Sequence, residues 1–149
     1  MVTQLDNFLL YWTKLDFFPN YKSLDQVFDR PIWADFRFAP EGWHVPTDEE
    51  WTVLTDYLGG EKMAGGKLKE AGTSPNVGAT NESGFTALPG GFRSSLGSYY
   101  DIGKSGYFWS STESGSLFAR ARKLYYDRSV VYRNDYIKRI GHSVRCVRD

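Results

Sequence analysis

The side chains that most often carry enzyme chemistry are few in this sequence: His44, His142 and Cys146. Neither histidine has a second ligand-type residue at the spacing that a zinc site requires, and no glycine-rich phosphate loop follows a strand and opens a helix. The acidic pair Glu49 and Glu50 falls in a helix-capping sequence. We therefore expect no catalytic residue, metal or cofactor, and we expect both histidines to be hydrogen-bonded structural residues.

The single cysteine does not indicate a compartment, since one thiol cannot form an internal disulfide. Cys146 lies in the stretch Ser143–Val147, where apolar residues alternate with polar ones. This alternation is typical of a half-buried strand, so we expect a buried and unreactive thiol.

The segment from Leu117 to Ile140 carries a different chemistry, that of a binding surface. Tyrosine, arginine, aspartate and asparagine are interspersed along it, and tyrosine offers a large contact area at low entropic cost. Because successive strand residues face opposite sides, the segment divides into two sets. The inward-facing frame comprises Arg122, Leu124, Tyr126, Val131 and Arg133. The predicted exposed and contiguous patch comprises Tyr125, Asp127, Val130, Tyr132, Asn134, Tyr136 and Arg139.

The elements that would position these strands begin with a helix. Thr47-Asp48-Glu49-Glu50 is a capping box with acidic residues at the positive end of the helix dipole. The predicted apolar face of this helix comprises Trp51, Leu54, Tyr57 and Leu58, and Gly59-Gly60 ends it. A second helix is predicted over Glu61–Glu70, closed by Gly72.

The rest of the chain predicts an α+β domain. Residues 78–106 are rich in turn residues, and β-forming runs follow from Tyr107 onward. Before the capping box, we expect an amphipathic helix over Leu5–Leu15 and a helical turn at Leu24–Phe28. The apolar run Phe8–Trp12 is too short to span a membrane, and no basic region precedes it. We therefore expect a soluble chain without signal peptide or membrane span.

Five phrases occur in order along the sequence: Gly42–Trp51, Ala64–Lys69, Thr80–Arg93, Gly106–Glu113 and Gly141–Asp149. They closely resemble the Fibrobacter succinogenes major paralogous domain family, which is related to the formylglycine-generating branch of the C-type lectin fold. The resemblance implies a loop-rich C-type-lectin-like domain over residues 41–149, with two main helices and short antiparallel strands. Residues 1–40 do not match the usual start of the family, and we expect them to pack on the domain.

The resemblance does not imply an activity. The formylglycine-generating relatives use cysteine chemistry, and this chain has one cysteine in a predicted strand. The Glu-Pro-Asn, Gln-Pro-Asp and Trp-Asn-Asp signatures of calcium-dependent lectins do not occur.

The C-terminal segment, about residues 117–142, also resembles the variable region of diversity-generating retroelement proteins. In those proteins, adenines of template Asn codons are scrambled, which excludes Lys, Glu, Gln, Met and Trp from the products. The predicted variable, ligand-binding positions all obey this exclusion: Arg120, Ala121, Tyr125, Asp127, Arg128, Val130, Tyr132, Asn134, Asp135, Tyr136, Ile137, Arg139 and Ile140. Lys123 does not, so it must be fixed in the template. The alternative is a fixed-sequence binding domain of the same family.

The charges are unevenly spread although their formal sum is zero. Acidic residues dominate up to Glu61, and basic residues dominate from Arg120 onward. The two ends either pair within the fold or form an anion- or nucleic-acid-binding end. Interleaving of the basic residues with Tyr and Asp argues against nucleic acid. The expected partner is a surface protein or glycan, with display on a virion or cell as one fitting location.

Overall fold

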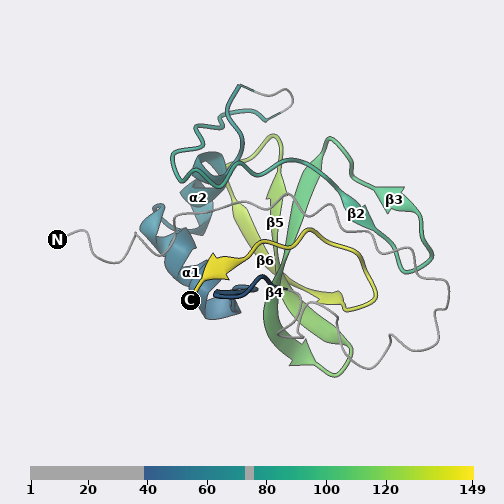
Figure 1. The fold of residues 1–149 in the computed structure, drawn as a ribbon. Coiled ribbons are helices and arrows are strands. Elements are labelled where there is room, and N and C mark those ends of the chain that lie inside the picture. Colours follow the sequence, from purple (N-terminus) through teal and green to yellow (C-terminus); the bar gives the residue numbers. More distant parts are fainter. Residues whose placement is uncertain (1–38, 73–75) are drawn as a thin grey trace.

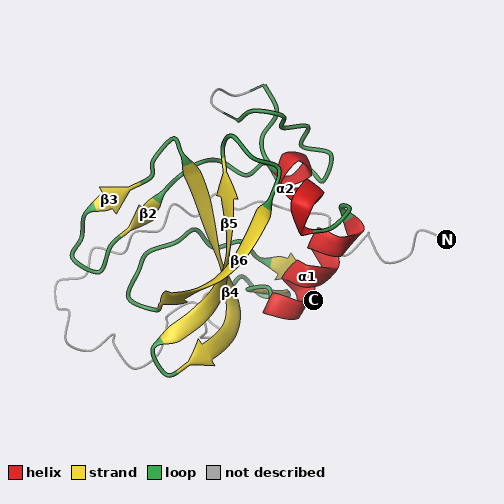
Figure 2. Ribbon diagram, turned by 180° about the vertical axis from the view of Figure 1, so that it is seen from behind, coloured by secondary structure: helices red, strands yellow, loops and turns green. Residues whose placement is uncertain are grey.

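The computed structural model describes residues 39–72 and 76–149. The helix expected over Leu5–Leu15, the turn at Leu24–Phe28 and the packing of the N-terminal segment lie outside the described residues. In the described part, two helices lie on one side of a three-stranded sheet and a small hairpin lies on the other (Figures 1 and 2). The α+β class predicted from the sequence is confirmed.

Helix α1 spans Asp48–Tyr57, and its capping box forms as predicted. The Glu50 amide donates to Thr47 Oγ1 at 3.2 Å, and the Thr47 amide donates to Glu50 Oε2 at 2.8 Å. The helix ends where Gly59 and Gly60 take φ values of 101° and 86°, which residues with a side chain rarely adopt.

Trp51, Leu54 and Leu58 form the buried face of this helix, but Tyr57 does not belong to it. Tyr57 is 62% exposed, so its predicted place in the core is wrong. The reason is helical geometry: at about 100° per residue, Tyr57 lies about 120° around the helix from Trp51.

Helix α2 spans Glu61–Leu68, two residues shorter than predicted. Lys69 is already extended, with φ −76° and ψ 146°, and pairs with Ala87 in an isolated parallel bridge. The chain therefore leaves the helix before Gly72 is reached.

Within the described residues, the strands form three antiparallel sheets. Strand β1 (Trp43–His44) pairs with β7 (Val147–Arg148), and β2 (Phe92–Arg93) pairs with β3 (Tyr99–Tyr100). The main sheet has the order β4-β5-β6, with bounds Ser105–Gly115, Phe118–Tyr125 and Val131–Ile137. Since β5 is the middle strand, both of its edges are paired.

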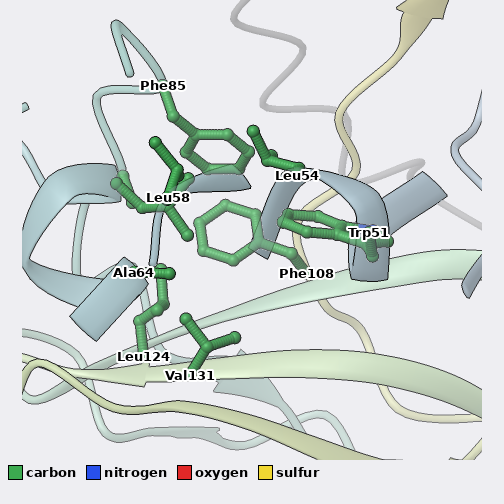
Figure 3. Close-up of a cluster of buried hydrophobic side chains, with 10 residues drawn as sticks. Trp51, Leu54, Leu58, Ala64, Phe85, Phe108, Leu124 and Val131 are labelled. Atoms are coloured by element: carbon green, nitrogen blue, oxygen red, sulfur yellow. The ribbon is translucent and has the colours of Figure 1, made fainter. Parts of the chain in front are cut away.

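The main core lies between the helices and one face of this sheet (Figure 3). Leu124 and Val131 rise from the sheet toward the aromatic cluster of Trp51, Phe85 and Phe108. The ring centroids of Phe85 lie 5.3 Å from Trp51 and 5.2 Å from Phe108. The large aromatic residues of the five sequence phrases separate into two groups. Trp51, Phe85, Phe108 and Trp109 are buried, whereas Trp43 and Phe92 are half-buried.

Candidate functional site

The register of β5 and β6 decides which side chains share a face. Leu124 stands opposite Val131, and Lys123 stands opposite Tyr132. Leu124 and Val131 point into the main core, so the alternate residues Tyr125, Lys123, Tyr132 and Asn134 point away from the helices. The predicted division into an inward frame and an outward set is therefore confirmed for these strands.

Five of the predicted ligand-binding residues lie on this outward side or in the loop that joins β5 and β6. We call them the tyrosine face: Tyr125, Tyr132 and Asn134 on the strands, with Asp127 and Arg128 in the connecting loop. The rings of Tyr125 and Tyr132 meet edge to face, with centroids 5.3 Å apart. Arg128 lies 5.0 Å from the Tyr125 ring and donates to the Tyr132 hydroxyl at 3.3 Å. Asp127 and Arg128 are exposed, whereas the strand residues are half-buried.

Lys123 occupies the middle of this outward side. Its Nζ lies 4.1 Å from the Tyr125 ring centroid, 4.7 Å from the Tyr107 ring centroid and 3.7 Å from Asp101 Oδ2. The Tyr107 hydroxyl also donates to Asp101, at 2.5 Å. The Asp101 carboxylate, the Tyr107 ring of β4 and the Tyr125 ring of its own strand thus surround the Lys123 ammonium group. In the sequence, Lys123 was notable only because lysine is excluded from products of template Asn codons. No local sequence pattern identified Asp101 as its partner.

Two predicted ligand-binding residues belong to a second core cluster instead. Ala121 is 0% exposed and packs with Trp109 and Ala119, so its assignment to the contact surface is wrong. Tyr136 is half-buried against the same cluster, and its ring meets Trp109 edge-on. The reason is that the middle strand β5 is covered on this side by the large Trp109 ring of the neighbouring strand. Burial accordingly raises the pKa of Tyr136.

The remaining predicted site residues lie outside the tyrosine face. Arg120 and Asp135 are cross-strand partners on the opposite face of the sheet, where Arg120 Nη1 lies 3.0 Å from Asp135 Oδ1. Ile137 shares that face and pairs with Phe118. Val130 lies in the connecting loop, and Arg139 and Ile140 follow β6. The thirteen predicted positions are therefore divided between the two faces of the sheet and the segments that follow β5 and β6. Of the seven residues predicted to form one exposed patch, Asp127 and Arg139 are exposed and the other five are half-buried.

The frame beneath the site is fixed by a buried ionic cluster. Asp48 and Arg122 are each 2% exposed, and Arg122 Nη1 donates to Asp48 Oδ1 at 2.5 Å. Arg133 donates to Asp48 Oδ2 through Nε at 2.8 Å and also through Nη2. Although 44% of the Arg133 side chain is exposed, its guanidinium thus belongs to the frame. Tyr126, also predicted for the frame, is half-buried.

These contacts bear on the uneven charge distribution along the sequence. Asp48 lies in the acidic first half, whereas Arg122 and Arg133 lie in the basic end. Pairing of the two regions within the fold, one of the two alternatives, therefore occurs at this cluster.

The two histidines differ from one another. His44 is hydrogen-bonded as predicted, with Nδ1 2.6 Å from Asp149 Oδ1 and Nε2 2.9 Å from Glu50 Oε1. Both ring nitrogens of His142 are shielded from solvent, and within the described residues neither has a hydrogen-bond partner. Its predicted hydrogen bonding is therefore wrong. The His142 ring instead stacks on Trp109 at 4.4 Å, and burial lowers its pKa to about 3.

Cys146 is half-buried rather than fully buried, and it lines a shallow apolar pocket with Trp51, Leu54 and Phe85. Burial raises the pKa of the thiol, which reduces the thiolate population at neutral pH.

Residues 39–72 and 76–149 contain neither a cluster of metal-ligand side chains nor a membrane-spanning helix. No group of three or more His, Cys, Asp or Glu side chains in this part could hold a metal ion. Within the same residues, no helix has the length and apolar character needed to cross a membrane.

Comparison with known proteins identifies a family. Residues 10–148 match the family model described as the Fibrobacter succinogenes major domain. No curated protein and no solved structure matches the chain. The match starts at residue 10, so the expectation that the resemblance begins near residue 41 is wrong. Because the match covers most of its length, this chain belongs to the Fibrobacter succinogenes major domain family.

Proposed function

We propose that this domain is a ligand-binding display protein, and specifically the variable protein of a diversity-generating retroelement that recognises a surface protein or glycan. The observation that carries the proposal is the tyrosine face. Two tyrosines and an asparagine lie half-buried on the outward side of β5 and β6, and an exposed aspartate and arginine lie in the loop that joins these strands. This composition is that of protein-binding loops, in which tyrosine supplies contact area and the polar residues supply adaptable hydrogen bonds.

The packing behind this face supports a surface that tolerates substitution. Leu124 and Val131 are buried in the main core, and Arg122 is tied to Asp48 on α1. The residues that stabilise the sheet therefore alternate with the residues that would contact a ligand. A change at Tyr132 or Asn134 leaves these core contacts in place.

At two of the predicted variable positions, one observation favours a fixed residue, as the alternative of a fixed-sequence binding domain requires. Ala121 and Tyr136 pack against Trp109, so most replacements there would disturb the second core cluster. We therefore restrict the proposed variable set to the tyrosine face and its exposed neighbours.

Anion or nucleic-acid binding receives less support, because many basic side chains already have carboxylate partners. Arg122 and Arg133 contact Asp48, Arg120 contacts Asp135, and Lys138 contacts Glu113 at 2.7 Å. Neutralised cations contribute little to a basic surface that could follow a phosphate backbone. Because the sequence offers no set of catalytic residues, we also propose that the domain binds a ligand and does not catalyse a reaction.

The test of the retroelement proposal is the DNA beside the coding sequence. We expect a reverse-transcriptase gene and a near-copy of the segment for residues 117–142, differing from it only at adenines. The differences should fall on codons for Tyr125, Asp127 and Tyr132, and spare those for Arg122 and Leu124. Absence of such a copy in the complete genome would reject the retroelement proposal in favour of the fixed-sequence domain.

A further inference from the structure

The phrase Ala64–Lys69 has no role in the tyrosine face, yet its last residue makes an unusual set of contacts. Lys69 is 2% exposed, and within the described residues its ammonium group donates to main-chain carbonyls alone. The acceptors are Val77 and Tyr126 at 2.9 Å, Arg128 at 3.1 Å and Tyr125 at 3.3 Å. Three of these four carbonyls belong to the end of β5 and the loop that follows it. Burial lowers the pKa of Lys69, with the nearby Asp127 acting in the opposite direction.

The glycines of the same phrase bring helix α2 directly against this loop. The Gly65 amide donates to the Ser129 carbonyl at 2.8 Å. A Cβ at position 65 would lie 2.7 Å from that oxygen and 3.0 Å from the Val130 oxygen. Glycine normally disfavours a helix interior, so its presence here is explained by the close approach of two backbones.

Two further hydrogen bonds join the main chain of the loop after β5 to the main chain of neighbouring segments. The Val77 amide donates to the Tyr126 carbonyl at 2.8 Å, and the Tyr126 amide donates to the Lys104 carbonyl at 3.0 Å. None of these bonds uses a side chain of the loop. They would therefore persist whichever residues occupy positions 127, 128 and 130.

We propose that the phrase Gly65–Lys69 is a main-chain anchor for the loop Tyr126–Val130, with Lys69 as its positioning residue. The ammonium group neutralises the converging negative ends of four carbonyl dipoles, which would otherwise repel one another around a side chain that is 2% exposed. The anchor fixes the loop backbone and leaves its side chains free to differ. Its meaning for ligand recognition rests on the proposed display function, but its existence can be tested without a ligand.

The experiment is limited trypsin digestion of the full chain, followed by mass spectrometry, because Arg128 lies in the anchored loop. We compare Lys69→Met with the matched control Lys67→Met, which changes a partly exposed lysine of the same phrase. Loss of hydrogen bonds from a buried charge should raise cleavage after Arg128 by about tenfold or more. The Lys67→Met control should stay within about twofold of the unaltered protein.

A second cleavage site separates positioning from general stability. Arg122 lies in the middle of β5 and is buried, so trypsin reaches it only when the sheet opens. Selective cleavage after Arg128 in Lys69→Met supports the anchor. Equal acceleration after Arg122 and Arg128, or no acceleration after Arg128, overturns it.

Hydrogen exchange of the unaltered protein provides a test if Lys69→Met fails to fold. The amides of Val77 and Tyr126 should exchange within about tenfold of the amides of helix α2, since the anchor makes the loop part of the folded unit. Exchange of these two amides at the rate of an unstructured chain would refute the anchor. A missing retroelement would reject the diversification proposal but would leave both results unchanged.

Discussion

Truncation of Asp48 distinguishes two explanations for an acidic residue at the start of helix α1. From the sequence, Asp48 complements the helix dipole, an effect of about 0.3 to 1 kcal/mol. In the structure it is also the carboxylate that contacts buried Arg122 through Oδ1 and two donors of Arg133 through Oδ2. Asp48→Ala would leave the Arg122 guanidinium buried without its counter-ion.

The expected loss follows from what remains around Arg122. Removing one member of a buried pair costs about 3 to 5 kcal/mol. Arg122 Nη2 keeps two acceptors, the Asp48 carbonyl at 3.0 Å and Thr52 Oγ1 at 3.2 Å. We therefore expect a decrease of about 3 kcal/mol in the free energy of unfolding, at the lower end of that range.

The assay is urea unfolding at neutral pH, followed by tryptophan fluorescence. The matched control is Glu49→Ala, which removes an exposed acid from the same helical turn and should cost about 1 kcal/mol or less. If Asp48→Ala proves no more damaging than Glu49→Ala, the ion cluster does not stabilise the fold and the reasoning from burial fails.

Three further predictions concern the core, the pH dependence and the thiol. Leu124→Ala should lower the free energy of unfolding by about 2 to 5 kcal/mol, whereas Tyr132→Ala should cost about 1 kcal/mol or less; the reverse order in urea titrations would contradict the inward and outward assignment. Burial lowers the pKa of His44, but its hydrogen bonds to Asp149 and Glu50 and their negative charges raise it above 6.5 overall. Protonated His44 therefore stabilises the fold below pH 6.5, and this stabilisation is lost as the pH rises through the pKa of His44 in the folded protein. The free energy of unfolding should decline from mildly acidic to alkaline pH, and His44→Gln should make that decline smaller. Cys146 should react with a thiol reagent more slowly in the folded protein than in urea, and equal rates would show that the thiol is freely accessible.

Local interactions made part of this fold predictable. The Thr47–Glu50 capping box, the glycine stop and the start of α2 depend on groups within a few residues of one another, so the sequence contains both partners. The alternation along β5 and β6 likewise depends only on strand geometry, and it correctly separated Leu124 and Val131 from Tyr125 and Tyr132.

Several of the corrections concern contacts between distant segments. Ala121 has the expected orientation in its strand, but its exposure depends on Trp109 in the neighbouring strand, which covers it. Asp48 lies 74 positions from Arg122, and Lys69 lies 56 to 59 positions from the three loop carbonyls that it contacts. Local sequence determined which elements form and which way their side chains point, because those depend on backbone geometry over a few residues. Only the tertiary structure decided which outward side chains are covered and which charges meet, because sheet register and helix packing bring the partners together.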